Sequence, residues 1–351
     1  MSEQKLQNFM QQKLASLKKN LFKVGCIVDN IIAVHDLLGI DAKSFGTGLR
    51  VYVEDETKLA SSLLGAQSTF ETSADGVLYD IKSNNIVFAH TDIVTFEVLK
   101  NFAISILSLD FECFFLKTFG LTQSALETYL KEFKLINNIF EYYIEENMLD
   151  ALIIIRFSRL IATKLRQPVI ASIVKDLNKH FYSDQDISLS NAACQILSIQ
   201  KQKIAIAESF TAGLITATFA RENKDYQNVI CRSFIVDSNN TKIEMLGLDV
   251  KLIEKFTAVS PEVAFEMAVG LLNKTSCDIA IASTGYLFNE DSAMQGLFYS
   301  GLGDKNAVHI YSHKYDFFDG DELLKISVNV MLFELITKLK KNAYANLEIA
   351  K

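Results

Sequence analysis

Apolar residues recur at two different spacings through the second half of the chain. Short runs of consecutive apolar residues are typical of buried strands, and longer segments with apolar residues three and four positions apart are typical of helices. The predicted strands span 203–207, 229–236, 278–282, 297–302 and 308–312, and the predicted helices span 189–200, 211–220, 240–246, 250–256, 260–271 and 321–339. Because strands alternate with helices, we expect a layered α/β domain over residues 187–345, with helices on both faces of its sheet.

A smaller group of elements precedes this domain. The pattern predicts strands at 111–119, 140–144 and 151–157 and helices at 121–133 and 167–181. Together these elements predict a small α+β module over residues 108–186. Residues 1–107 form a third part. In it, 24–28 and 49–53 are predicted strands, and 77–81 and 86–88 are a predicted hairpin around Asn84 and Asn85.

Composition limits the class of protein. The 351 residues are 49% hydrophobic and 22% charged, with two prolines, which is typical of a globular protein. A net charge of −7 argues against binding to nucleic acid, which usually needs a basic face. The N-terminus lacks the apolar core of a signal peptide, and the apolar runs at 151–155 and 328–336 are too short to cross a membrane. We therefore expect a cytoplasmic protein with no membrane partner, and a mean hydropathy of +0.17 favours a homodimer.

Cysteine and histidine do not indicate a metal site. The five cysteines are Cys26, Cys113, Cys194, Cys231 and Cys277. No two of them have the spacing of a zinc or redox motif, and most lie in apolar runs, so we interpret them as buried, reduced thiols. His309 and His313 are four residues apart, but the segment that begins at Val308 is a predicted strand, where that spacing is a poor chelate. We expect neither a metal nor another cofactor.

Polar residues gather where three of the predicted strands end. The strands at 203–207, 229–236 and 278–282 are followed, in that order, by Ser209 and Thr211, by Asn239 and Lys242, and by Thr284 and Gly285. Ligands of open α/β sheets bind at the carboxyl ends of strands, where a helix N-terminus can hold an anion or oxyanion. Ordinary helix capping by Ser209 and Thr211 and a solvated Lys242 would explain the same pattern without any chemistry.

Five sequence blocks occur in the order found in one known family. The blocks are Ala207-Glu208-Ser209-Phe210-Thr211-Ala212-Gly213; Ser238-Asn239 with Lys242 and Leu246-Gly247-Leu248; Ala258-Val259-Ser260-Pro261-Glu262; Ala282-Ser283-Thr284-Gly285; and Gly296 followed by Gly320-Asp321. With these blocks, residues 189–339 resemble the CinA family of nicotinamide mononucleotide amidohydrolases. Residues 116–130 are similar to the segment that joins the two main domains of CinA.

The resemblance implies a metal-independent hydrolase. Its substrate would be nicotinamide mononucleotide or a related small-molecule nucleotide, whose carboxamide becomes a carboxylic acid and ammonia. Ser209 would be the nucleophile and Lys242 its base or electrostatic partner. The backbone N–H groups at the start of helix 211–220 would hold the oxyanion. The implied substrate-binding residues are Thr211, Asn239, Thr284, Gly285 and Lys325.

Four positions depart from the family pattern. Ala212 replaces the second residue of the Thr-Gly-Gly turn, a small steric change, and Asp237 replaces a tyrosine. A bulkier segment at 285–289 replaces a glycine-containing loop. Glu322 replaces an arginine, and Lys325 is the nearest basic residue that could contact a phosphate.

The N-terminal part departs further from the family. Residues 72–107 are similar in length and pattern to the end of its molybdopterin-binding-like (MoCF-like) first domain, but the glycine- and proline-containing loops of that domain are absent. We interpret 1–107 as a truncated, degenerate MoCF-like domain without nucleotide pyrophosphatase activity. Two alternatives stay open: a catalytically degenerate CinA-like protein that binds a nucleotide or another partner, and an α/β binding protein unrelated to CinA.

Overall fold

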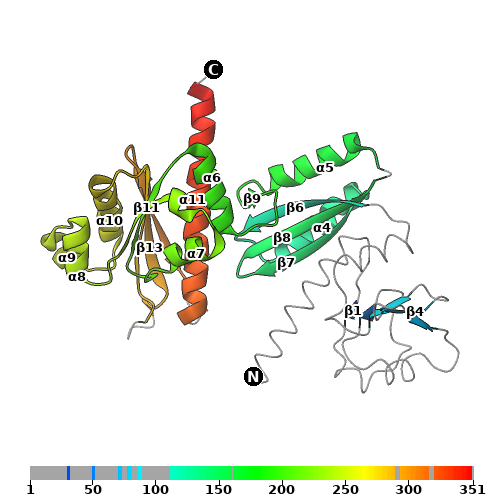
Figure 1. Cartoon of the computed structure of the whole chain (residues 1–351), viewed down its shortest axis with the longest axis horizontal. Coiled ribbons are helices and arrows are strands. Elements are labelled where there is room, and N and C mark those ends of the chain that lie inside the picture. Colours follow the sequence, from blue (N-terminus) through cyan, green and yellow to red (C-terminus); the bar gives the residue numbers. More distant parts are fainter. Residues whose placement is uncertain are drawn as a thin grey trace. The chain divides into compact units, whose positions relative to one another are not determined.

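The structure, a computed structural model, describes residues 111–159, 161–288, 293–315 and 320–349 together with five short upstream strands (Figure 1). The upstream strands are β1 (Asn30–Ile31), β2 (Arg50–Val51), β3 (Phe70–Thr72), β4 (Val77–Asp80) and β5 (Asn85–Phe88), in the sheet order β1-β2-β5-β4-β3. β4 and β5 pair antiparallel, with Asp80 opposite Asn85, which confirms the predicted hairpin. The predicted strand at 24–28 lies outside the described residues, as does most of the segment 1–107 that we interpret as a MoCF-like domain.

The chain divides into two compact units, of which the second comprises residues 117–121, 147–150 and 179 onward. The elements that follow the upstream strands are β6 (Phe111–Phe119), α4 (Gln123–Ile136), β7 (Glu141–Asn147), β8 (Asp150–Ser158) and α5 (Thr163–Asp176). In β8, residues 151–157 are all buried. Leu126 and Leu130 of α4 and Ile173 of α5 are buried too, so these helices turn an apolar face inward. The strands and helices of the predicted α+β module are present.

The end of the predicted helix at 167–181 was wrong. α5 ends at Asp176, and the strand β9 (Phe181–Ser183) pairs antiparallel with the last residues of β6. The Tyr182 side chain is buried, and its hydroxyl donates to the Asp150 carboxylate at 2.8 Å. A strand pairing, which helical periodicity cannot reveal, therefore fixes this segment.

The second unit contains a five-stranded sheet in the order β11-β10-β12-β13-β14. Its strands are β10 (Ile204–Glu208), β11 (Ile230–Ile235), β12 (Ile279–Gly285), β13 (Leu297–Asp304) and β14 (Val308–Lys314). Its helices are α6 (Leu189–Gln200), α7 (Leu214–Glu222), α8 (Asn239–Thr241), α9 (Val250–Phe256), α10 (Pro261–Lys274) and α11 (Gly320–Ile349). β10 is parallel to β11 and β12, whereas β13 and β14 are antiparallel additions. This arrangement confirms the layered α/β fold.

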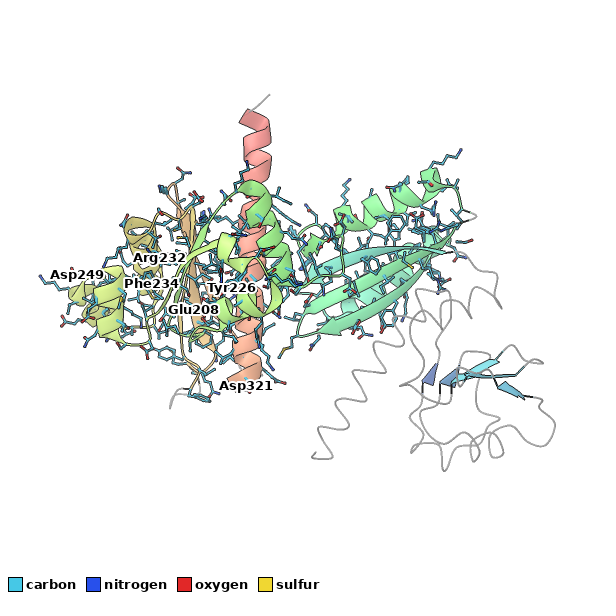
Figure 2. The ribbon with its side chains drawn as sticks, viewed as in Figure 1. Glu208, Tyr226, Arg232, Phe234, Asp249 and Asp321 are labelled. Carbon is cyan, nitrogen blue, oxygen red and sulfur yellow. The ribbon has the colours of Figure 1, made fainter. Side chains whose placement is uncertain are left out.

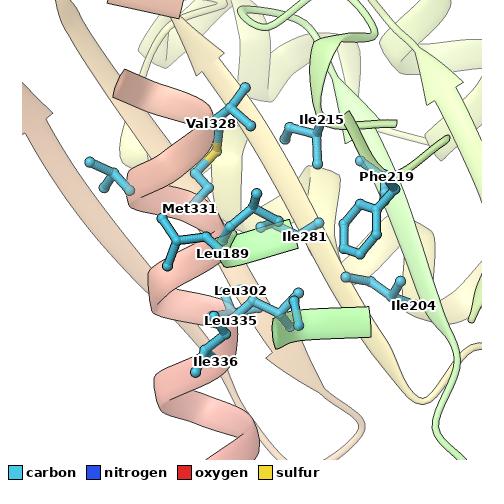
Figure 3. Close-up of a cluster of buried hydrophobic side chains, with 14 of the residues drawn as sticks. Leu189, Ile204, Ile215, Phe219, Ile281, Leu302, Val328, Met331, Leu335 and Ile336 are labelled. Carbon is cyan, nitrogen blue, oxygen red and sulfur yellow. The ribbon is translucent and has the colours of Figure 1, made fainter. Parts of the chain in front are cut away.

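The two faces of this sheet differ in side-chain size. β10 reads Ile-Ala-Ile-Ala from Ile204, β12 reads the same from Ile279, and these two residues are register partners. The isoleucines of both strands therefore lie on one face of the sheet, where α6, α7 and α11 pack against them (Figure 3). The alanines lie on the other face beneath α10. Small residues suit that face because a Cβ built on Gly301 would lie 2.3 Å from the Ala264 carbonyl oxygen of α10.

Two helix boundaries at one edge of the sheet differ from the prediction. α7 begins at Leu214 and not at Thr211, because Ala212 and Gly213 have φ values of 50° and 95°, outside the helical range. The predicted helix at 240–246 is the short α8 followed by a π-helix, η5 (Lys242–Leu246).

No helix in the described part of the chain has an apolar stretch long enough to cross a membrane.

Candidate functional site

The polar segments predicted to carry chemistry meet at one edge of the second unit's sheet. β10, β11 and β12 run in the same direction, so their carboxyl ends at Glu208, Ile235 and Gly285 lie together. The Ser209 N–H donates to the Ser283 carbonyl at 3.1 Å, which joins the segments after β10 and β12. The Val236 N–H donates to the Glu208 carbonyl at 2.8 Å, which joins the segments after β11 and β10. The parallel topology thus brings together residues that are far apart in sequence.

Ser209 and Lys242 are in direct contact at this edge. The Lys242 Nζ donates to the Ser209 Oγ at 3.0 Å, and also to the carbonyl oxygens of Val236 at 2.9 Å and Asp237 at 3.4 Å. The Lys242 side chain is 1% exposed, whereas Ser209 is half-buried. A lysine amine can make three hydrogen bonds. Two of them go to these carbonyls, and the third is directed at the Ser209 hydroxyl.

Burial changes the acid–base chemistry of Lys242. Desolvation lowers the pKa of the Lys242 amine from its ordinary value of 10.5, because the charged form loses its hydration. The Asp237 carboxylate opposes this effect and raises the pKa of the same amine. A lysine in such surroundings holds a neutral amine at lower pH than a solvated lysine does, as a general base requires.

The turn that carries Lys242 is fixed by local hydrogen bonds. Ser238 caps α8: its Oγ accepts from the Thr241 N–H at 3.1 Å, and the Thr241 Oγ1 accepts from the Ser238 N–H at 3.2 Å. The π-helix η5 then begins at Lys242. A Cβ built on Gly270 of α10 would lie 2.4 Å from the Leu246 carbonyl oxygen, so only glycine there lets η5 pack this closely.

Glu208 organises the loop that carries Ser209, a role that the sequence pattern did not predict. Glu208 ends β10 (Figure 2), and its side chain is fully buried. Its carboxylate accepts from the Thr211 Oγ1 at 2.8 Å, the Ile215 N–H at 2.9 Å, and the Thr216 N–H and Oγ1 at 3.0 and 2.7 Å. The signal that could have found it is a charged residue that directly continues a buried apolar run.

Glu208 narrows the choice of oxyanion donors. At the start of α7, the N–H of Leu214 donates to the Thr211 carbonyl, and the next two N–H groups donate to Glu208. Within the part of the chain that the structure describes, the N–H groups of residues 210–213 donate no hydrogen bond. These four groups lie in the turn that follows Ser209, so we interpret them as the candidate oxyanion donors.

The other predicted substrate-binding residues lie in different surroundings. Thr211 is 1% exposed, and its hydroxyl contacts Glu208 and Ser283. Thr284 is equally buried and donates to the Ala258 carbonyl at 2.8 Å. The two threonines thus hold the strand ends together. Asn239 is exposed at the start of α8.

Gly285 and Lys325 complete the predicted set. A Cβ on Gly285 would lie 2.4 Å from the Phe298 Cβ and 2.9 Å from the Phe210 Cδ2, so this glycine allows two stacked rings to approach the strand end. Lys325 is exposed on α11, and within the described residues no contact links it to Ser209. The structure therefore brings together Ser209, Thr211 and Lys242, and within the described residues it gives no contact between Lys325 and any of the three.

The departures from the family pattern also have defined positions. Ala212 is exposed and in the left-handed region, so its effect is on the backbone and not only steric. Asp237 and Glu322 are both exposed.

Among the residues that the structure describes, no group of three His, Cys, Asp or Glu side chains is placed to hold a metal ion.

The family model of the CinA C-terminal domain matches residues 186–339, which contain the whole edge just described. These residues form a CinA C-terminal domain. A putative competence-damage inducible protein of Finegoldia magna is 32% identical over 134 residues, or 38% of this chain and 31% of the relative. A putative competence-damage inducible protein of Caldicellulosiruptor saccharolyticus is 34% identical over 151 residues, which cover 42% of this chain and 36% of the relative. The chain thus spans about a third of the length of these two relatives.

A longer match reaches beyond the CinA domain. A putative competence-damage inducible protein of Clostridium beijerinckii is 24% identical over 321 residues, which cover 88% of this chain and 70% of the relative. Among solved structures, a CinA superfamily protein of Escherichia coli is 26% identical, with a TM-score of 0.40, and the match covers 42% of this chain and 87% of that one. A CinA superfamily protein of Klebsiella pneumoniae is 22% identical, with a TM-score of 0.42, and the match covers 44% of this chain and 96% of that one.

Proposed function

We propose that the CinA domain is a metal-independent amide hydrolase in which Ser209 is the nucleophile and Lys242 is its base. The observation that carries the proposal is the 3.0 Å contact between the Lys242 amine and the Ser209 hydroxyl, with the lysine side chain 1% exposed. A serine hydroxyl is a weak nucleophile until a neighbouring base takes its proton. Few structural reasons exist to bury a lysine against a serine, because burying a charge is unfavourable.

The proposed reaction proceeds in two stages. The neutral Lys242 amine accepts the Ser209 proton as the Oγ attacks the carbon of a carboxamide. The oxyanion that forms is held by N–H groups of residues 210–213. Lys242 then gives its proton to the departing nitrogen, and ammonia leaves an ester on Ser209. Water, deprotonated by the same amine, hydrolyses this ester to a carboxylic acid and restores the serine hydroxyl.

The proposed substrate is nicotinamide mononucleotide or a close relative of it. This choice is inferred from the resemblance to the CinA amidohydrolases. A carboxamide carries no charge. Within the described residues, Lys242 is the only buried cation beside Ser209, so an uncharged reacting group suits this site. The Val236 and Asp237 carbonyls would orient the amine throughout.

A second candidate function is supported by the buried threonines. Thr211 and Thr284 use their hydroxyls inside the protein, and Lys325 has no contact with Ser209 in the described part of the chain. A site with fewer substrate contacts would suit a catalytically degenerate CinA-like protein that binds a nucleotide or another partner.

Ammonia release from nicotinamide mononucleotide by the purified chain tests the proposal. We expect turnover in the wild type, a loss of at least about a thousandfold in Ser209→Ala, and no change in Ser198→Ala, an exposed serine on α6. Lys242→Met should lose activity while Lys251→Met, an exposed lysine on α9, keeps it. A folded wild type that releases no ammonia, or an active Ser209→Ala variant, would reject the hydrolase and favour the binding function.

A further inference from the structure

The antiparallel half of the second unit's sheet contains a polar cluster that the proposed reaction does not use. Glu334 of α11 is buried, and its carboxylate accepts from the Ser300 Oγ of β13 at 2.6 Å and from the His313 Nε2 of β14 at 2.6 Å. A buried carboxylate is unfavourable unless it has partners, and apolar residues of similar size would stabilise the domain at least as well. Stability alone therefore does not explain why this cluster is polar.

The His313 ring begins a row of stacked rings. It lies against Phe298, its partner across the β13–β14 pairing, with 4.7 Å between the ring centroids. Phe298 is fully buried and stacks on Phe210, with 5.1 Å between the centroids and 9° between the ring planes. A continuous row of contacts thus connects the Glu334 carboxylate with Phe210, the residue directly after Ser209.

Phe210 is held in a different way from its two neighbours in the chain. The Ser209 N–H donates to the Ser283 carbonyl, and the Thr211 hydroxyl donates to the Glu208 carboxylate, so hydrogen bonds hold both neighbours at the strand ends. Within the described residues the Phe210 N–H donates no hydrogen bond, but its ring is 6% exposed and packed in the row of stacked rings. A displaced ring would therefore turn the peptide group that joins Ser209 to Phe210, whose N–H is a candidate oxyanion donor.

We propose that His313, held by Glu334, is a positioning residue of the Ser209 site. Its ring supports Phe298, which in turn fixes Phe210 and the turn that holds the oxyanion. The proposal rests on the proposed function, because it assumes that the oxyanion forms at residues 210–213. His313 acts through two other rings, so its loss should weaken an interaction made in the transition state. It should lower kcat and leave KM unchanged.

Two double variants that differ only in the ring at position 313 test the proposal. They are His313→Phe, Glu334→Leu and His313→Ala, Glu334→Leu, and both remove the carboxylate, so neither leaves a buried charge without a partner. With nicotinamide mononucleotide, the variant with phenylalanine should keep a kcat within about threefold of the wild type. The variant with alanine should lose at least about tenfold in kcat, because small displacements of catalytic groups are costly.

A single variant tests the same row of rings at its centre. Phe298→Leu removes the middle ring and leaves His313 and Glu334 in place, so it should lower kcat as much as the variant with alanine does. The matched control is His309→Ala, an exposed histidine on the same strand, which should keep the wild-type kcat and KM. Equal kcat values in the two double variants, full kcat in Phe298→Leu, or an effect confined to KM would overturn the proposal and leave the hydrolase intact.

Backbone ¹⁵N relaxation of the full chain separates this proposal from the proposed function, since it needs no substrate. The order parameters of residues 210–213 should fall in His313→Ala, Glu334→Leu and in Phe298→Leu, and stay at the wild-type values in His313→Phe, Glu334→Leu and in His309→Ala. If the wild type hydrolyses nothing, the proposed function fails, and this measurement alone decides whether His313 positions the turn. Unchanged order parameters in the variant with alanine would overturn the proposal.

Discussion

Replacing Ala212 by glycine should stabilise the CinA domain, although it removes a methyl group. Ala212 has φ 50° and is exposed, so its side chain makes little contribution to packing. The left-handed conformation costs a residue with a side chain about 1–2 kcal/mol, and glycine avoids this cost. Glycine also makes the unfolded chain more flexible, which offsets about 0.4–1 kcal/mol of the gain.

The net effect of Ala212→Gly is thus a stabilisation of about 0.5–1 kcal/mol. For a domain of this size the unfolding midpoint should rise by about 1–4 °C. The matched control is Ala217→Gly, the same substitution at an exposed position inside α7, where glycine should lower stability by about 1 kcal/mol. Thermal and urea unfolding, followed by circular dichroism, measure both variants. If Ala212→Gly lowered the midpoint as Ala217→Gly does, the left-handed turn before α7 would not be a source of strain.

Three further predictions concern the edge of the sheet. Glu208→Gln should destabilise the domain by about 3–5 kcal/mol, because an amide cannot accept from all four donors that meet the carboxylate. The kcat/KM should rise with pH as the Lys242 amine loses its proton, with a midpoint below 10.5, and Asp237→Asn should move that midpoint to lower pH because Asp237 raises the pKa of Lys242. Gly270→Ala should cost about 1–3 kcal/mol and reduce activity, since its Cβ would force the Leu246 carbonyl and η5 away.

Each of these predictions has a result that contradicts it. A Glu208→Gln variant as stable as the wild type in urea would mean that the carboxylate does not organise the α7 N-terminus. A midpoint that rises in Asp237→Asn, or a profile that falls with pH over the same range, would contradict Lys242 as a neutral base. Full activity in Gly270→Ala would show that the position of η5 does not control Lys242.

The sheet itself could be predicted because its signal is strong and local. Both central strands repeat Ile-Ala, and a run that is apolar at every position is typical of a strand buried on two faces. The parallel order of β10, β11 and β12 follows from helical crossovers between them. That order also brings Ser209 close to the end of β11, so the general position of the site was within reach of the sequence.

The details of the site were not predictable from the pattern, for identifiable reasons. Lys242 lies in a polar segment, and its burial depends on a π-helical start and on two loop carbonyls, none of which leaves a periodic signal. The start of α7 was placed too early because Thr211 fits helical spacing, while the positive φ of Ala212 contradicts the preference of alanine. Thr284 was expected to face a substrate, but its hydroxyl donates to a neighbouring loop, a tertiary contact that spacing cannot show.

The central claim is that Lys242 activates Ser209, and covalent labelling tests it without knowledge of the substrate. The full chain is incubated with a fluorophosphonate, which reacts with activated serines, and the modified peptide is identified by mass spectrometry. The proposed function predicts an adduct on Ser209 that is absent in Ser209→Ala, reduced at least about a hundredfold in Lys242→Met, and unchanged in Lys251→Met. An adduct on another serine, or undiminished labelling of Ser209 in Lys242→Met, would contradict the claim.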